Sequence, residues 1–219
     1  MTASRVAACL AAALGTVGGA AAQDVALAGF VSSVEHRVDA GFGVERSSGL
    51  VGGARVTVGL PPRVELALTA SAGPLERDSA NAEDRDVAEI RLDARYHTLS
   101  WLWLETGVAT RTYSAPIAVQ RWTTLRLGAE ARVPFLGDRA EGVGRLLFLP
   151  LVSVTGVDQP ELALTAAAGV EYRLGPVLAG VFYWLERYDF PVQDEIARVE
   201  QLSGLMVRAS ARVLRFNSR

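Results

Sequence analysis

Apolar and polar residues alternate along most of this sequence with a period of two. The segment from Ala88 to Tyr96 is the clearest case, since its even positions carry Ala, Ile, Leu, Ala and Tyr and its odd positions carry Glu, Arg, Asp and Arg. A strand separates two such sets onto opposite faces, whereas a helix would mix them. The same alternation recurs over residues 63–72 and 161–174. The pattern predicts an all-β chain.

Ten strands are predicted in this way, and most are long enough for a tilted strand to cross a bilayer, which takes about nine to eleven residues. The expected fold is an antiparallel up-and-down transmembrane β-barrel over residues 35–216, with eight or twelve strands as alternatives and residues 23–34 as an N-terminal periplasmic segment. The predicted strands cover residues 35–46, 49–60, 63–73, 86–97, 101–113, 120–135, 142–155, 160–174, 176–188 and 198–215.

The connections between these strands alternate in length. One set is short, at residues 61–62, 98–100, 136–141 and 175–176. The opposite set is mostly longer, at residues 74–85, 114–119 and 189–197, with a short exception at Ser47-Ser48. Short turns on the periplasmic side and longer external loops are typical of outer-membrane barrels.

Three features favour a barrel that turns its apolar face to lipid over a soluble barrel that buries it. The apolar face carries almost no charge in mid-strand, where an arginine in lipid costs about 2–4 kcal/mol. The charged face is rich in glycine, for example Gly53, Gly107 and Gly169, which predicts room for long charged side chains inside a narrow barrel. The third feature is a set of aromatic residues at strand ends, expected as two girdles at headgroup level: Tyr96, Trp101, Phe135 and Tyr172 at one end and Tyr113, Trp122 and Tyr188 at the other.

On these patterns the chain resembles the bacterial outer-membrane β-barrel superfamily over essentially all of its length after residue 22. The resemblance rests on pattern and not on a short motif, so it does not narrow to one family. It implies outer-membrane lipid as the surroundings and insertion by the barrel-assembly machinery, which reads a C-terminal strand ending in an aromatic residue. The chain departs from that signal because Asn217-Ser218-Arg219 follow Phe216.

The N-terminal residues 1–22 have the pattern of a secretory signal peptide. Arg5 supplies the positive charge, residues 6–17 the apolar region, and Ala20-Ala21-Ala22 a cleavage site before Gln23. The alternatives are a short membrane helix and a lipoprotein box ending in Cys9. Cys9 is the only cysteine and lies within the apolar region, so the mature chain is expected to lack disulfides and thiolate sites.

Charge and composition exclude several classes of function. The chain has 22 basic and 24 acidic residues and no lysine, and no basic patch suggests nucleic acid. After the signal region no apolar run is long enough for a membrane helix. No cofactor is expected, and no His, Asp and Glu cluster has the spacing of a metal site.

The interior of the predicted barrel, its lumen, should hold arginines and carboxylates in nearly equal number, because charges in a filled interior need partners. A structural network of ion pairs is favoured over a selective pore, since a barrel of ten strands has little open bore. The predicted lumen network comprises Arg37, Asp39, Arg63, Glu65, Glu89, Arg91, Asp93, Arg95, Glu105, Arg126, Glu130, Arg132, Glu171, Arg173, Arg208 and Arg212, with Glu45, Arg55, Arg111 and Glu186 on the same face.

Catalysis finds little support in the sequence. The histidines are His36 and His97, both expected at periplasmic strand ends, and only His97 has hydroxyl side chains nearby, on Thr98 and Ser100. Residues 146–152 are apolar on both faces, which indicates a small internal core or, alternatively, a site for an apolar ligand. The predicted function is an outer-membrane barrel with a structural or narrow-channel role. A secreted soluble barrel for a small apolar ligand is the first alternative and an outer-membrane hydrolase the second.

Overall fold

The structure, a computed structural model, describes residues 24–41, 43–80, 82–116, 118–137, 139–192 and 196–215, with side chains as far as Val213. The predicted signal peptide, Cys9, the cleavage site before Gln23 and the terminal Phe216 lie outside these residues.

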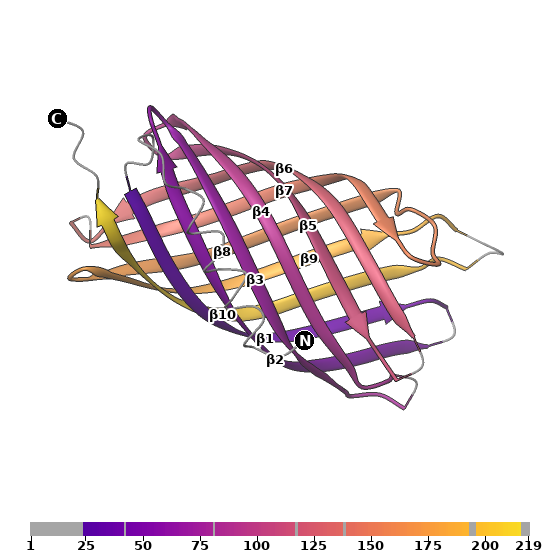
Figure 1. The fold of residues 1–219 in the computed structure, drawn as a ribbon. Coiled ribbons are helices and arrows are strands. Elements are labelled where there is room, and N and C mark those ends of the chain that lie inside the picture. The colour runs from indigo at the N-terminus through magenta and orange to yellow at the C-terminus, as the bar shows by residue number, and fades with distance from the viewer. Residues whose placement is uncertain are drawn as a thin grey trace.

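The described residues form ten antiparallel strands that close into one barrel in sequence order (Figure 1), and this confirms the predicted fold. Each strand pairs with its neighbours along the chain, and β1 pairs with β10 to complete the ring. Closure leaves no sheet edge, so ladder hydrogen bonds satisfy the strand backbones. The strands are β1 Asp24–Asp39, β2 Val44–Leu60, β3 Val64–Arg77, β4 Arg85–Leu99, β5 Leu102–Ser114, β6 Val119–Phe135, β7 Ala140–Val154, β8 Leu162–Leu174, β9 Val177–Asp189 and β10 Val199–Arg215.

The first strand differs from its prediction. β1 begins at Asp24 and ends at Asp39, so the expected periplasmic segment over residues 23–34 is wrong for residues 24–34. The expected turn at Ser47-Ser48 is also wrong, because Ser47 lies within β2 and the turn falls before Val44. Small residues blur the alternation in the first half of β1, but pairing with β10 and β2 along its whole length holds it extended.

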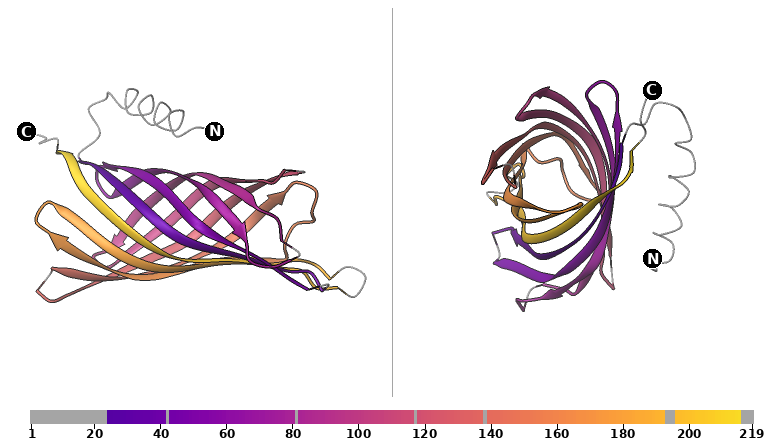
Figure 2. Two further views of the ribbon diagram at one scale, coloured as in Figure 1. Left: turned by 90° about the horizontal axis from the view of Figure 1, so that it is seen from below. Right: turned by 90° about the vertical axis from the view of Figure 1, so that its left-hand side faces the viewer.

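The two ends of the barrel differ, and Figure 2 shows them from two sides. The terminal end holds the first residue of β1, the last residue of β10 and the connections 61–63, 100–101, 136–139 and 175–176. The loop end holds the connections 40–43, 78–84, 115–118, 155–161 and 190–198, and the longest connections are there. This asymmetry follows the predicted one, apart from the first turn.

The apolar set of each strand faces outward and the polar set inward. In β4, Ile90 and Leu92 are 59% and 50% exposed, while Asp93 between the outward positions is fully buried. In β8, Leu164 and Val170 are exposed, while Thr165 is buried. The exterior is therefore apolar and the interior polar, the reverse of a soluble barrel.

Two of the interior glycines make room for an aromatic ring. A Cβ atom on Gly53 would lie 2.3 Å from the Phe30 ring, and one on Gly169 would lie 2.4 Å from the ring of Phe182. Both rings belong to neighbouring strands and occupy the space that a side chain would need. At Gly107 the nearest side chain is the charged Asp93, as the sequence predicts. The glycines thus accommodate aromatic and charged side chains alike.

In the part of the chain that the structure describes, no helix has the length and apolar character needed to span a membrane.

Candidate functional site: the barrel interior

The interior contains a network of ion pairs that we call the charged layer. Several of its pairs join strands that are not neighbours and so bridge the inner wall. Arg95 of β4 contacts Glu130 of β6 at 3.1 Å, and it also contacts Glu65 of β3 at 2.5 Å. Arg55 of β2 contacts Asp93 of β4 at 3.4 Å.

The charged layer continues around the wall through the later strands. Arg132 of β6 contacts Glu130 at 2.7 Å and Glu171 of β8 at 3.0 Å, and Arg208 of β10 also contacts Glu171. Arg145 of β7 pairs with a carboxylate of β5, Glu105. Together with the pairs of Arg95, the contacts of Arg132 and Arg208 form one continuous set of paired charges from β3 to β10.

One arginine spans the whole bore. Arg111 of β5 contacts Glu89 of the adjacent β4 at 2.5 Å and Glu186 of β9, on the far side, at 2.6 Å. Glu186 also accepts hydrogen bonds from Tyr188 and Thr165. Since all three charged side chains are largely buried, the triad ties opposite walls of the barrel together.

Several residues predicted in the lumen lie elsewhere. In β1 the buried positions are Val34, His36 and Val38, so Arg37 and Asp39 point outward with side chains 43% and 46% exposed. Arg63 is exposed in the 61–63 turn. Arg173 and Arg212 have the inward register of their strands but lie at the exposed rim of the terminal end. The predicted position of Arg173 and Arg212 in the lumen is wrong, because the ends of these two strands extend beyond the interior into solvent.

The remaining predicted lumen residues point inward: Glu65, Glu89, Arg91, Asp93, Arg95, Glu105, Arg126, Glu130, Arg132, Glu171 and Arg208, together with Arg55, Arg111 and Glu186. The sequence reading missed Arg145, which the apolar run of β7 obscured although it has the same parity as the buried Val143 and Leu147.

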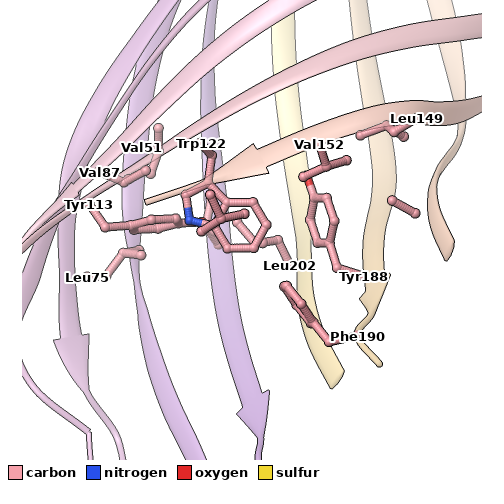
Figure 3. Packing of buried hydrophobic residues seen from close by; sticks show 13 residues of the cluster. Val51, Leu75, Val87, Tyr113, Trp122, Leu149, Val152, Tyr188, Phe190 and Leu202 are labelled. Carbon is pink, nitrogen blue, oxygen red and sulfur yellow. The ribbon is translucent and has the colours of Figure 1, made fainter. Parts of the chain in front are cut away.

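The loop end of the interior is closed by an aromatic cluster, comprising Tyr113, Trp122, Tyr188 and Phe190 (Figure 3). Trp122 is central, with its ring 4.7 Å from that of Tyr188 and 6.1 Å from that of Phe190. Aliphatic residues complete the packing, among them Leu75, Leu149 and Val152. The apolar stretch of β7 therefore contributes to an internal core here.

This cluster corrects half of the predicted aromatic girdle. Tyr113, Trp122 and Tyr188 are 3%, 1% and 1% exposed, so they line the interior and not a headgroup region. Each shares its parity with an inward charge on its own strand, namely Arg111, Arg126 and Glu186. The other predicted girdle residues, Tyr96, Trp101, Phe135 and Tyr172, are exposed on the outside near the terminal end.

The two histidines lie at opposite ends of the barrel. His36 is near the loop end of β1, so its expected place at the same end as His97 is wrong. His36 is buried, lies 3.3 Å from Glu200 through Nε2 and stacks on Tyr113 at 4.9 Å. No hydrogen bond joins it to a hydroxyl side chain among the described residues, although Ser47 is its cross-strand neighbour. His97 stacks on Trp103 at 4.4 Å, while the Thr98 hydroxyl donates to the carbonyl of Tyr96.

No group of three or more potential ligand side chains that could hold a metal ion occurs among the described residues. What the interior does contain is a cavity of about 160 Å³, lined by residues of the charged layer and by apolar residues mostly from β1 and β8 to β10. Its wall includes Arg126, which lies opposite a β-bulge of β7. There, Leu125 pairs with Leu151 and Leu127 with Phe148, so two residues of β7 face Arg126 alone. Bulges of this kind re-aim side chains.

Comparison with solved structures gives bacterial outer-membrane barrels. The structure is similar to the translocator domain of the autotransporter NalP from Neisseria meningitidis, with 13% identity, 95% of each chain covered and a TM-score of 0.46. It is also similar to Neisserial surface protein A, with 12% identity over 86% of this chain and 99% of that one and a TM-score of 0.39. No family model matches the sequence, and comparison with curated protein sequences gives no match. The resemblance is to bacterial outer-membrane β-barrels as an architecture.

Proposed function

We propose that this protein spans a bacterial outer membrane as a β-barrel with a filled bore, in a structural or narrow-channel role. The observation that carries the proposal is the inverted distribution of side chains. Large apolar side chains are exposed on the outside of every strand, while charged ones are buried within. The outward set includes Val31, Leu50, Leu66, Ile90, Leu104, Leu127, Leu146, Val170, Val181 and Leu205.

Such an exterior favours lipid over water on energetic grounds. Apolar surface in water costs about 25 cal/mol per Å², and soluble monomers rarely expose contiguous apolar patches beyond a few hundred Å². Here the apolar positions encircle the whole barrel, so no single partner surface would cover them. Lipid covers them from all sides at once.

The outward aromatic residues at the terminal end fit the same placement. Tyr96, Trp101, Phe135 and Tyr172 are between 40% and 48% exposed and lie close to the short turns. Amphipathic rings favour the headgroup region, with an apolar body in the acyl chains and a polar tip in water. The terminal end, with its short turns, would then be the periplasmic end.

Two layers in series argue against an open pore. The charged layer fills the bore with paired side chains, and the aromatic cluster closes the loop end, where Trp122 and Tyr188 are almost completely buried. An ion crossing the barrel would have to displace both. We therefore expect at most small and intermittent conductance, and we propose no catalytic role.

Cell fractionation and gel mobility test the membrane placement. Folded membrane barrels resist denaturing detergent until heated, so the unheated protein should migrate differently from the heated one and should occur in the outer-membrane fraction. A soluble protein whose mobility is the same before and after heating would overturn the proposal and favour a secreted barrel. A large steady conductance in planar bilayers would instead refute the filled bore.

A further inference from the structure

The central cavity has two chemically different walls. The arginines around it come mostly from β4 to β7, namely Arg91, Arg95, Arg111, Arg126 and Arg145. The apolar side chains come mostly from β1 and β8 to β10, among them Phe30, Ala167, Trp184, Leu202 and Met206. The carboxylates of Glu89, Glu130 and Glu186 also line the cavity, but the arginines outnumber them. A molecule inside would therefore meet a net positive charge on one side and an aromatic and aliphatic surface on the other.

Arg126 lacks an ion pair, unlike the other described arginines of this wall. It is 2% exposed, and its Nε is buried without a hydrogen-bond partner, a feature that it shares with Arg91, Arg95 and Arg208. Among the described residues, no carboxylate lies within ion-pair distance of it, whereas Arg111 and Arg145 each contact carboxylates directly. A guanidinium carries five donors and cannot be neutralised by losing a proton, so its burial without an acceptor costs free energy.

We propose that the cavity binds a small organic anion, a carboxylate with a compact apolar body. The carboxylate would accept hydrogen bonds from Arg126, in the bidentate geometry that guanidinium favours. The apolar body would pack on Phe30, Trp184 and Met206. The volume suits this class, since a cavity of about 150 Å³ is known to hold benzene.

The ligand would reach the cavity from the terminal end. The aromatic cluster closes the loop end, while Arg95 and Arg208 line the cavity nearer the terminal end and retain some exposure. The proposal concerns the interior alone, so it holds whether or not the membrane placement is correct.

Isothermal titration of the refolded mature protein in a nonionic detergent tests the site with three probes. Benzoate carries both the charge and the ring, benzyl alcohol only the ring, and inorganic phosphate only the charge. We expect saturable binding of benzoate, at least about tenfold tighter than either of the others, which corresponds to about 1.4 kcal/mol. Equal binding of benzyl alcohol would refute the role of the charge, and equal binding of phosphate would refute the role of the apolar wall.

A matched pair of variants then assigns the charge to one residue. Arg126→Met keeps the apolar stem and should weaken benzoate binding at least about tenfold. Arg187→Met removes the same charge from an exposed side chain that does not line the cavity, and it should bind as the unmodified protein does. Unchanged binding in Arg126→Met would overturn the proposal. The three-probe comparison needs no variant, so it decides the question even if Arg126→Met fails to fold.

Discussion

The arginine that spans the bore should be the most sensitive single position of the charged layer. In Arg111→Met the stem still fills space, but Glu89 and Glu186 lose the guanidinium that lies 2.5 and 2.6 Å away. The side chains of both carboxylates are largely buried. The variant thus leaves two buried negative charges where a bridged triad had been.

The magnitude follows from the partners that stay. Removing one partner of a buried ion pair costs about 3–5 kcal/mol, mainly because the other charge is left unpaired. Glu186 keeps the hydrogen bonds from Tyr188 and Thr165, and Glu89 keeps a contact with Arg91 at 3.7 Å. These contacts offset part of the loss, so we expect a decrease of about 4 kcal/mol in the free energy of unfolding and not twice the single-pair value.

Arg126→Met provides the internal comparison, because it removes the same group from the neighbouring strand without leaving a carboxylate unpaired. The free energy of unfolding should change little or rise by about 1–3 kcal/mol, because the variant removes the cost of a buried unsatisfied polar group. Unfolding in urea, followed by gel mobility and tryptophan fluorescence, measures both variants. The decrease in unfolding free energy caused by Arg111→Met should be smaller at acid pH, where the two carboxylates are protonated. It should also be smaller in the triple variant that adds Glu89→Gln and Glu186→Gln. If Arg126→Met proves as damaging as Arg111→Met, the reasoning about paired and unpaired charges is wrong.

Four other predictions concern separate parts of the protein. Leu92→Arg places a charge on the outward face and should block membrane assembly at a cost of about 2–4 kcal/mol, whereas Leu92→Ala should assemble normally in the same fractionation assay. Trp122→Ala should destabilise the barrel by about 3–5 kcal/mol and raise its conductance in planar bilayers; unchanged conductance would mean that the aromatic cluster does not limit passage. Gly169→Val should cost about 1–3 kcal/mol in urea unfolding because its Cβ would lie 2.4 Å from the Phe182 ring, and adding Phe182→Ala should recover part of that loss. Intact mass of the exported protein should place the mature N-terminus within two residues of Gln23, and a lipidated Cys9 at that terminus would contradict it.

The strand count and most strand boundaries could be predicted because the alternation is strict wherever one face meets an apolar environment. In β4 and β8 every second residue is apolar, and a shift by one residue would turn all of them inward. The prediction failed in β1, where small side chains at Ala26, Ala28 and Gly29 carry no clear pattern. That strand is defined by its partners, since β10 and β2 pair with it along its full length.

The aromatic residues show that a position near a strand end does not say which face of the strand a side chain occupies. The face follows from parity, that is, from whether the residue is an even or an odd number of positions from a known inward residue. Tyr113 and Tyr96 both lie near the end of a strand, but Tyr113 has the parity of the inward Arg111 and Tyr96 that of the outward Leu92. Strand-end position alone assigned both to a girdle, whereas parity separates them. The partners of each charge could not be predicted, because contacts such as Arg111 with Glu186 join strands that are distant in the sequence and depend on the diameter of the closed barrel.

Two groups of aromatic residues therefore lie at the two ends of the barrel and point in opposite senses. At the terminal end Tyr96, Trp101 and Tyr172 point outward, and at the loop end Trp122 and Tyr188 point inward. An outward ring at the terminal end can hold the barrel at one depth in a bilayer, while an inward cluster at the loop end excludes water from the bore behind it. Exclusion of water strengthens the electrostatic interactions beneath the cluster, because the local dielectric is lower there. The closure that we propose to limit conduction would thus also make the unpaired Arg126, behind the cluster, a stronger site for an anion than an exposed arginine.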